Sequence, residues 1–439
     1  MNNRPPVTRK RPVTSAQPDR LAEESGGPYQ DSDLTRWLPS AAQRGHNGSR
    51  DVLGGDVLFP VVVLKAGAIA HNARVMAQYC RDNDAYLAPH CKTHMSTELA
   101  QLQLAEGAWA VTVANVSQAR VFRTAGASRI LIANQVIDDQ ALRWIAAELS
   151  LDPELEIYCL VDSQAGVEIM DQVLQEACLR RPLAVLVELG FVGGRSGCRS
   201  AEEAVSVAGA VNAKARLRLA GVECYEGILG DTPDAVTLTQ VDSLFIRLRD
   251  LAGDLVRLGL LDGSEEVIVS AGGSAFFDRA VDLLARDLDV GRPTRLVLRC
   301  GAYLSHDHGM YQKLSPFGTR LPDRPPLRAA CELWARVNSR PEPNLAILGF
   351  GKRDCAFDVE LPTPLSINDR RGNRQARDMR VMQLNDQHAY LRIPENENIA
   401  VGDLVCLGMS HPCTIFDKWR DLPVVDDSYN IIRTIHTSF

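Results

Sequence analysis

Two residues near the end of the chain have the types and spacing to bind a metal ion. His411 and Cys413 are two positions apart in the segment Ser410–Cys413, which follows an apolar run that predicts a strand. In an extended segment, side chains at positions i and i+2 project to the same side. Imidazole and thiolate together favour Zn²⁺, with Mn²⁺ or Co²⁺ as further candidates. The spacing therefore predicts a metal site with two protein ligands.

The number of ligands indicates what kind of metal site this would be. A structural zinc site takes four protein ligands, and no Cys-x-x-Cys motif lies near the pair. Two side chains with open coordination positions suit a catalytic metal instead. His388 is a candidate neighbour, either as a third ligand or as a group that transfers a proton. A buried cysteine beside a surface histidine is the alternative that needs no metal.

A lysine far upstream offers a second kind of chemistry. Lys92 lies at the predicted C-terminal end of a strand, in the segment LAPHCKTHMS, with His90 and His94 on either side. A partly desolvated amine there is suited to form an imine with an aldehyde. An ordinary loop lysine is the alternative. Together with the metal pair, Lys92 predicts one active site that combines a Schiff-base lysine and a divalent metal.

A glycine-rich turn at another strand end could bind an anion. Gly272, Gly273 and Ser274 lie between a predicted strand and a predicted helix. Exposed backbone N–H groups and a helix N-terminus favour a phosphate at such a turn. A tight connection between strand and helix would need the same residues.

Further polar and aromatic residues fall at or near strand ends. Arg195 could face a cofactor oxygen or could cap a loop, and Tyr225 and Tyr303 could contact a ring or serve packing. Arg299 lies within the last predicted strand of this region. A charge there predicts a buried partner inside the fold.

Composition excludes several classes of protein. The chain has 439 residues, of which 45% are hydrophobic and 23% charged, and its formal net charge of −7 argues against a nucleic-acid or anionic-membrane partner. No apolar stretch approaches the ~20 residues that span a bilayer. The basic N-terminus lacks the apolar region of a secretory signal. Eleven scattered cysteines indicate reduced thiols and no disulfide framework, so we expect a cytoplasmic protein.

Short apolar runs alternate with amphipathic segments from residue 59 to about residue 310. About nine predicted strands and eight helices fill roughly 250 residues, which matches a (β/α)8 barrel with its functional residues at the C-terminal strand ends. Near-continuous apolar strands indicate a parallel sheet covered by helices. A doubly wound sheet is the alternative, but no Gly-x-Gly-x-x-Gly motif follows the first strand.

The sequence changes character on both sides of this region. Residues 1–30 are rich in Pro, Arg and Ser with almost no aliphatic residues, which predicts a disordered tail. We expect the barrel and a lead-in segment at 31–310. Over residues 311–439 helical periodicity fades into prolines, turns and short strand-like runs, which predicts a smaller all-β domain that carries the metal pair.

These motifs, in this order, resemble the fold-type III pyridoxal-phosphate enzymes. More narrowly, the chain resembles the D-threonine aldolase and D-serine dehydratase family, which includes bacterial amino-acid deaminases. The resemblance runs from about residue 55 to the end, through segments such as VELGFVGGRSGCR, GVECYEG, SAGGSAFFD, LRCGAYLSHDHGMY and SHPCTIFDKW. It implies an α/β chain with an alanine-racemase-like (β/α)8 barrel followed by a C-terminal all-β domain, and a homodimer.

The resemblance also implies roles for the residues named above. Lys92 would carry pyridoxal 5′-phosphate and remove the α-proton of the substrate, with His388 as a second catalytic group. His411 and Cys413 would bind the metal. The other expected cofactor contacts are His90, Arg195, Tyr225, Gly272, Gly273, Ser274 and Tyr303.

The metal pair distinguishes two reactions within the resembled family. Dehydratase members use His-x-Cys with zinc, as this chain would, whereas aldolase members tend to have His-x-Asp and a harder metal. Cys413 therefore favours a lyase that dehydrates a D-β-hydroxy amino acid such as D-serine to a keto acid and ammonia. The alternatives are a D-threonine-type retro-aldolase that gives glycine and an aldehyde, an amino-acid racemase, and a non-catalytic pyridoxal-phosphate carrier.

Overall fold

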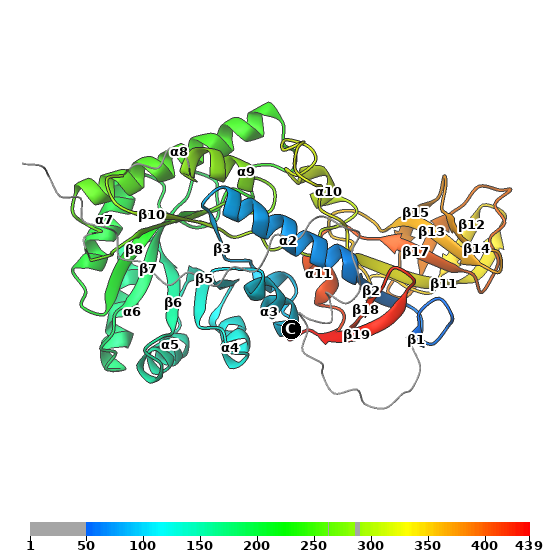
Figure 1. The fold of residues 1–439 in the computed structure, drawn as a ribbon, viewed down its shortest axis with the longest axis horizontal. Coiled ribbons are helices and arrows are strands. Elements are labelled where there is room, and N and C mark those ends of the chain that lie inside the picture. Colours follow the sequence, from blue (N-terminus) through cyan, green and yellow to red (C-terminus); the bar gives the residue numbers. More distant parts are fainter. Residues whose placement is uncertain (1–49, 262, 286–289) are drawn as a thin grey trace, which may run out of the picture.

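Two sheets organise the chain in a computed structural model that describes residues 50–261, 263–285 and 290–439. The predicted tail at 1–30 lies outside these residues. One sheet has eight strands and the other has eleven. In Figure 1 the eight-stranded sheet and its helices form one part of the molecule, and the second sheet lies beside it.

The eight-stranded sheet is parallel and runs in the order β3-β10-β9-β8-β7-β6-β5-β4. Its strands are β3 (Tyr86–Leu87), β4 (Val111–Val113), β5 (Arg129–Gln135), β6 (Glu156–Val161), β7 (Leu183–Leu189), β8 (Leu217–Cys224), β9 (Val267–Ala271) and β10 (Thr294–Leu298). The two ends of this order are joined, because Trp109 N–H donates to Leu87 O at 2.7 Å and Thr112 N–H donates to Pro89 O at 2.9 Å. The sheet thus closes into the expected alanine-racemase-like barrel.

Helices follow the barrel strands in sequence and cover the outside of the sheet. They are α3 (Thr97–Ala105), α4 (Val116–Thr124), α5 (Asp139–Leu151), α6 (Gln164–Glu176), α7 (Ala201–Asn212), α8 (Ala235–Arg257) and α9 (Phe277–Ala280), which continues into the short π-helical segment η2 (Val281–Ala285). Several begin at a side chain that accepts a backbone N–H of the first turn, as at Asn115, Asp138 and Asp234. Such caps satisfy N–H groups that have no partner within the helix, which explains where these helices start.

The second sheet contains the strands expected near the C-terminus and others that the sequence did not predict. Its strands are β1 (Arg50–Asp51), β2 (Val61–Lys65), β11 (Cys331–Glu342), β12 (Leu345–Leu348), β13 (Thr363–Asp369), β14 (Gly372–Gln375), β15 (Arg380–Leu384), β16 (Ala389–Arg392), β17 (Leu404–Gly408), β18 (Asp421–Val425) and β19 (Asn430–His436). Two short helices, α10 (Met310–Leu314) and α11 (Cys413–Phe416), lie where this sheet meets the barrel (Figure 1).

The strand β2 lies in the second sheet, although the sequence pattern placed it among the alternating strands of the barrel region. It pairs antiparallel with β11 and parallel with β18. The barrel closes with eight strands, so a ninth must pair elsewhere. Val61 and Val63 pack with Trp334 in a small core on one face of the second sheet. From residue 50 the chain therefore runs first through the second sheet, then through α2 (Ala66–Asp82) into the barrel, and afterwards returns to the second sheet.

Two further observations concern the state of the cysteines and the apolar character of the helices. All eleven cysteines are free, and all except Cys178 and Cys413 are buried. In the described part of the chain no helix combines the length and the apolar character that crossing a membrane requires.

Candidate active site

Lys92 lies in η1 (Cys91–Thr93), a short 3₁₀ turn just beyond β3 at the C-terminal end of the barrel. It faces a pocket of about 230 Å³. The residues that line this pocket lie at the C-terminal ends of seven of the eight barrel strands or in the loops after them, and they are His90, Lys92, Ala114, Ala133, Asn134, Arg195, Ser196, Tyr225, Gly273 and Arg299. The closed barrel thus brings together residues that are as far apart in the sequence as His90 and Arg299, as expected for a ring of strand ends.

The Lys92 amine lies open to the pocket but is surrounded by protein. This partial burial lowers the pKa of Lys92, the nearby charges of Arg195 and Arg299 lower it further, and Cys413 opposes the change. A lowered pKa raises the fraction of neutral amine near neutral pH. The neutral amine is the form that attacks an aldehyde, so the surroundings of Lys92 suit imine formation.

His90 presents an uncharged ring to the same pocket. Burial holds the pKa of His90 well below its usual value, and the positive charges of Lys92 and Arg299 add to this effect. Its Nδ1 is buried and has no hydrogen-bond partner among the described residues. A neutral imidazole with an unused nitrogen beside Lys92 fits an aromatic cofactor that would lie against it.

Arg195 and Tyr225 form one wall of the pocket. The Arg195 guanidinium carbon lies 4.9 Å from the centre of the Tyr225 ring, a cation–π arrangement that holds the arginine in place. The loop after β7 that carries Arg195 is fixed on both sides, because Ser196 Oγ donates to Glu188 at 2.8 Å and Gly197 N–H donates to Asp162 at 3.0 Å. The structure thus places both predicted cofactor contacts at the pocket.

The glycine-rich turn after β9 lies at the same end of the barrel. Gly272 has a φ of +81°, and a Cβ there would come within 2.7 Å of the Leu298 side chain. Ser274 Oγ accepts the Ala302 N–H at 3.2 Å, so the turns after β9 and β10 meet. These are the seventh and eighth strands of the barrel, where barrels commonly build their phosphate sites. The turn therefore fits the phosphate of pyridoxal phosphate.

Two buried carboxyl groups beside this turn are absent from the sequence-based prediction. Glu226 accepts the Gly273 N–H at 2.5 Å, and burial raises the pKa of Glu226. Glu223 forms the ion pair with Arg299 that confirms the expected buried partner. Burial raises the pKa of Glu223 to about 8, although the Arg299 charge opposes this. Both glutamates stand near the end of a strand that the sequence marked only by Tyr225.

The His411–Cys413 pair follows a strand of the other sheet and comes close to Lys92. Cys413 Sγ lies 3.4 Å from Oγ1 of Thr93, the residue next to Lys92, although the two are 320 positions apart. The segment is not extended, as the sequence interpretation assumed: His411 has a φ of +57°, and Cys413 begins α11. Pro412 disfavours the right-handed helical conformation for the residue before it, so the chain turns at this point. The two side chains still interact across that turn.

Charges around the pair favour a thiolate and an oriented imidazole. Burial by itself would raise the pKa of Cys413, but hydrogen bonds from His411 and Thr93 lower it. The same contact with Cys413 raises the pKa of His411 to about 9, and burial opposes this. His411 Nδ1 lies 2.5 Å from Asp358, which also accepts the Thr414 hydroxyl at 2.7 Å. A carboxylate on Nδ1 leaves Nε2 of the ring available to a metal.

A buried aspartate fixes the backbone of the metal pair. Asp307 Oδ1 accepts the N–H groups of Gly309 and Tyr311 at 2.9 Å each, and its Oδ2 accepts the His411 N–H at 3.0 Å. One carboxylate thereby caps α10 and holds the segment that follows β17. Asp307 and Asp358 were not predicted from the sequence, because each acts on His411, which lies 104 positions from Asp307 and 53 positions from Asp358.

Two predicted site residues lie away from the pocket. Tyr303 is buried, its hydroxyl accepts the Gln103 amide at 3.0 Å, and it lines a different cavity of about 370 Å³ beside α2 and α3. His388 lies exposed in the turn between β15 and β16, and its side chain contacts no hydrogen-bonding partner within the described residues. No group of three or more His, Cys, Asp or Glu side chains in that part of the chain is arranged to hold a metal ion.

The donor chemistry of the pair nevertheless fits a metal bound by two protein side chains. Imidazole nitrogen and thiolate sulfur are the ligands that zinc prefers. Both groups are positioned, one by Asp358 and the other by Thr93, and both lie next to the Lys92 pocket.

Comparisons with known proteins agree with this geometry. Residues 64–293 match the family model described as alanine racemase, N-terminal domain, and residues 330–425 match the one described as putative serine dehydratase domain. A D-threonine aldolase of Arthrobacter sp is 25% identical over 391 residues, which are 89% of this chain and 93% of that protein.

Solved structures share the fold. A D-threonine aldolase from Filomicrobium marinum superposes with a TM-score of 0.73 at 23% identity, over 89% of this chain and 98% of that chain. A D-threo-3-hydroxyaspartate dehydratase from Delftia sp. HT23 superposes with a TM-score of 0.69 at 19% identity, over 88% and 99% of the two chains.

Proposed function

The chain belongs to the alanine racemase N-terminal domain family of fold-type III pyridoxal-phosphate enzymes, and on that premise we propose that it is a metal-assisted lyase of D-β-hydroxy amino acids. The favoured reaction is dehydration of a D-serine-like substrate, which yields a keto acid and ammonia. The reaction would need a cofactor and a metal. The Lys92 pocket would bind the cofactor, and His411 and Cys413 would bind the metal.

One observation carries the proposal. The 3.4 Å contact between Thr93 Oγ1 and Cys413 Sγ brings the metal pair next to Lys92. The lysine would deprotonate the α-carbon of the amino acid, and the metal would bind the hydroxyl group on its β-carbon. The α- and β-carbons are bonded to each other, so the lysine and the metal must lie within a few ångströms of each other. Neither a racemase nor a simple cofactor carrier would need the second group there.

The protein side chains would bind, orient and deprotonate the substrate. Pyridoxal phosphate, held by Lys92 and the Gly272–Ser274 turn, supplies an electron sink for the substrate's α-carbon. The lowered pKa of Lys92 suits its Nζ to accept the α-proton. Arg195 lines the pocket, and its guanidinium would favour the carboxylate of an amino acid, whereas Arg299 is paired with Glu223.

Residues that follow strands of the second sheet would assist the departure of the hydroxyl group. A divalent metal on His411 and Cys413, zinc in our proposal with Mn²⁺ or Co²⁺ as alternatives, supplies Lewis acidity for the departure of a hydroxyl group. Asp358 would fix the ring of His411, and Asp307 would fix its backbone. Hydroxide is a poor leaving group, so the position of these residues would control the rate.

A retro-aldolase is the second candidate, and the relative from Arthrobacter favours it. Such an enzyme would remove the proton of the β-hydroxyl group and release glycine. We favour dehydration because a thiolate at position 413 matches zinc, whereas an oxygen ligand would match a harder metal.

One assay separates the two reactions. The purified protein, loaded with pyridoxal phosphate and zinc, is incubated with D-serine, D-threonine and D-threo-3-hydroxyaspartate. Keto acid with ammonia supports the dehydratase, and glycine with an aldehyde supports the aldolase. Conversion of the D-amino acids to their L-forms without either product pair would refute both.

We also propose that the protein works as a cytoplasmic homodimer. Eleven free cysteines fit a reducing compartment. Phe357, Val359 and Leu361 expose apolar side chains around Asp358, which suits a subunit contact near the metal pair. Sedimentation of the purified protein as a monomer would refute the dimer.

A further inference from the structure

We propose that Arg320 is a positioning residue that fixes the turn Gly272–Ala275 for the cofactor phosphate. The inference rests on the proposed function, because it assigns the phosphate of pyridoxal phosphate to this turn. Arg320 lies about fifty positions after the turn and belongs to none of the motifs described above. It does not line the Lys92 pocket, so it would act through the residues that it holds.

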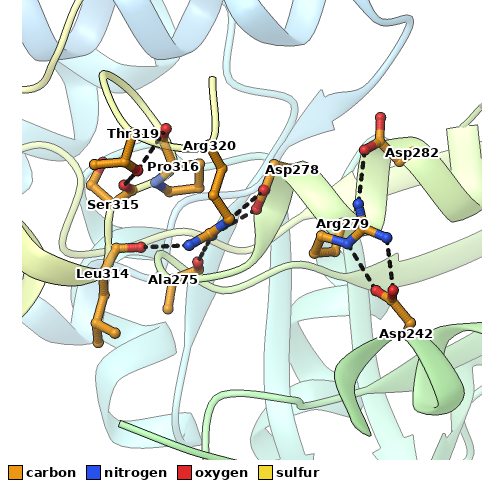
Figure 2. Close-up of polar contacts among 10 residues, drawn as sticks. All are labelled: Asp242, Ala275, Asp278, Arg279, Asp282, Leu314, Ser315, Pro316, Thr319 and Arg320. Carbon is orange, nitrogen blue, oxygen red and sulfur yellow. Dashed lines mark hydrogen bonds and ion pairs between the residues drawn. The ribbon is translucent and has the colours of Figure 1, made fainter. Parts of the chain in front are cut away.

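Arg320 clamps the residues that follow the turn. Its Nε donates to Asp278 Oδ2 at 2.7 Å and its Nη2 donates to Asp278 Oδ1 at 2.9 Å. The same Nη2 donates to Ala275 O, the last carbonyl of the turn. Figure 2 shows the guanidinium between these two acceptors. One planar group therefore fixes both the end of the turn and the first residues of α9.

Burial makes this contact specific for arginine. The Asp278 side chain is 5% exposed and the Arg320 side chain 18% exposed, so little water can replace the ion pair. A guanidinium donates two parallel hydrogen bonds to a carboxylate and keeps a further N–H for a carbonyl. A lysine ammonium keeps the charge but cannot reproduce that planar fork. Substitution by lysine should therefore free the turn, while Asp278 still has a positive charge beside it.

The clamp also connects the turn to the chain that leads to the metal pair. Arg320 Nη1 lies 3.4 Å from Leu314 O at the end of α10, and Thr319 Oγ1 donates to Ser315 O at 2.6 Å (Figure 2). The other end of α10 is capped by Asp307, which holds His411. Arg320 thus sets the phosphate turn relative to α10, and α10 relative to the second sheet.

Aromatic packing holds the same two segments together without Arg320. The rings of Phe277 and Phe317 lie 4.9 Å apart, and Tyr79 lies 5.3 Å and 5.2 Å from them. These buried edge-to-face contacts do not involve the guanidinium. We therefore expect a substitution at Arg320 to leave the protein folded while it alters the turn.

The neighbouring Arg279 provides a matched control. Its Nε and Nη2 donate to the two oxygens of Asp242 at 2.8 Å and 2.7 Å, so it also forms a two-bond ion pair. It connects α9 to α8, however, and Figure 2 shows it directed away from Ala275. A lysine at position 279 would disturb an ion pair of the same kind on the same helix without touching the turn.

The experiment compares the affinities of wild type, Arg320→Lys and Arg279→Lys for two ligands, pyridoxal 5′-phosphate and pyridoxal, which lacks the phosphate. Binding is followed by the absorbance of the lysine-bound chromophore after the resident cofactor is removed by dialysis. We expect Arg320→Lys to bind pyridoxal phosphate roughly tenfold or more weakly and pyridoxal normally, because a displaced turn loses only the phosphate contacts. Arg279→Lys should match the wild type with both ligands.

Two results would overturn the inference. The first is that Arg320→Lys binds pyridoxal phosphate as tightly as the wild type does. The second is that its affinity falls by the same factor for both ligands, which would show a general structural role. If Arg320→Lys does not fold, Asp278→Asn is measured in its place, and the same outcomes decide. A wild type that binds neither ligand would refute the proposed function itself, and that result is distinguishable from the other two.

Discussion

Lys92 and the His411–Cys413 pair lie close together, because Thr93 contacts Cys413, but the fold positions them by different means. Lys92 follows a barrel strand, and backbone hydrogen bonds from Thr112 and Trp109 fix its place in the closed ring. The metal pair follows β17 in the second sheet, and the side chains of Asp307 and Asp358 fix it. In the barrel, backbone hydrogen bonds between repeated βα units bring the strand ends together and so position Lys92. In the second sheet, individual polar side chains position His411 and Cys413.

The pKa values of the histidines on the two sides also shift in opposite directions. Burial lowers the pKa of His94 to about 4 and holds the pKa of His90 well below its usual value. Contact with Cys413 raises the pKa of His411 to about 9. The barrel side thus disfavours protonation of its imidazoles by excluding water, whereas the Cys413 and Asp358 side chains around His411 oppose that effect of burial. Four predictions follow from these contrasts, in order of expected effect.

The largest effect should come from the barrel side. Lys92→Ala should lower turnover by on the order of 10⁴-fold, because the variant loses both the amine that holds the cofactor and the base for the α-proton. Its absorbance should lack the band of a lysine-bound cofactor. The control is Lys352→Ala, an exposed lysine of the second sheet region, which should keep wild-type activity. Turnover in Lys92→Ala close to that of the wild type would refute the assigned role.

Substitution on the other side should change the outcome of the reaction as well as its rate. Cys413→Ala should lose bound zinc and about 10³-fold in turnover, because the leaving hydroxyl then has no Lewis acid. Cys413→Asp should recover part of the metal content and raise the ratio of glycine to keto acid. Metal analysis and product assays measure both effects, with Cys178→Ala, an exposed cysteine, as the control. An unchanged product ratio in Cys413→Asp would show that the metal pair does not decide between the two reactions.

The neutral barrel histidines predict a loss of stability in acid. His94 has a folded-state pKa of about 4 and an ordinary value of 6.5 in the unfolded chain, so the unfolded state binds more protons between these pH values. Stability therefore falls as the pH drops from 6.5 towards 4, by roughly 3 kcal/mol from this residue alone.

Denaturant unfolding at pH 7 and at pH 4.5 measures this effect. The difference in unfolding free energy between the two pH values should be smaller in His94→Gln than in the wild type. A glutamine can retain a hydrogen bond to Gln103, the present partner of His94, but it takes up no proton. Equal differences in the two proteins would show that His94 does not contribute.

The smallest effect should come from the side chain that orients the metal ligand. Asp358→Asn keeps the shape of the residue but weakens its hold on His411 Nδ1, so zinc affinity should fall by about 10- to 100-fold. The control is Asp386→Asn, which alters an exposed ion pair with Arg353 in the same part of the chain. Equal zinc affinity in the two variants would mean that the backbone alone positions the metal pair.

The sequence predicted the parts of the site that depend on local pattern. Alternating apolar runs and amphipathic helices predicted the barrel, and strand ends in that barrel predicted Lys92, Arg195, Tyr225 and the Gly272–Ser274 turn. A charge inside a strand predicted that Arg299 has a buried partner, and Glu223 is that partner. The positions of these residues at strand ends could be predicted because side-chain periodicity follows from short stretches of chain.

Other parts depended on contacts between distant segments. The pairing of β2 with β11 and β18 could not be read from the alternation, because an apolar run does not specify its neighbour in a sheet. Tyr303 falls at a strand end yet faces a different cavity, and His388 stays a prediction without a contact in the pocket.

The sequence by itself therefore determined which chemical groups this protein has and on which kind of element each one stands. Only the tertiary structure decided that Thr93 meets Cys413, that Asp307 and Asp358 hold His411, and that Arg320 binds the Ala275 carbonyl after the glycine-rich turn. The physical reason is that hydrogen bonds and ion pairs act over about 3 Å in space, whatever the separation in sequence. A local pattern fixes the direction of a side chain, but the packing of the two sheets decides what it meets.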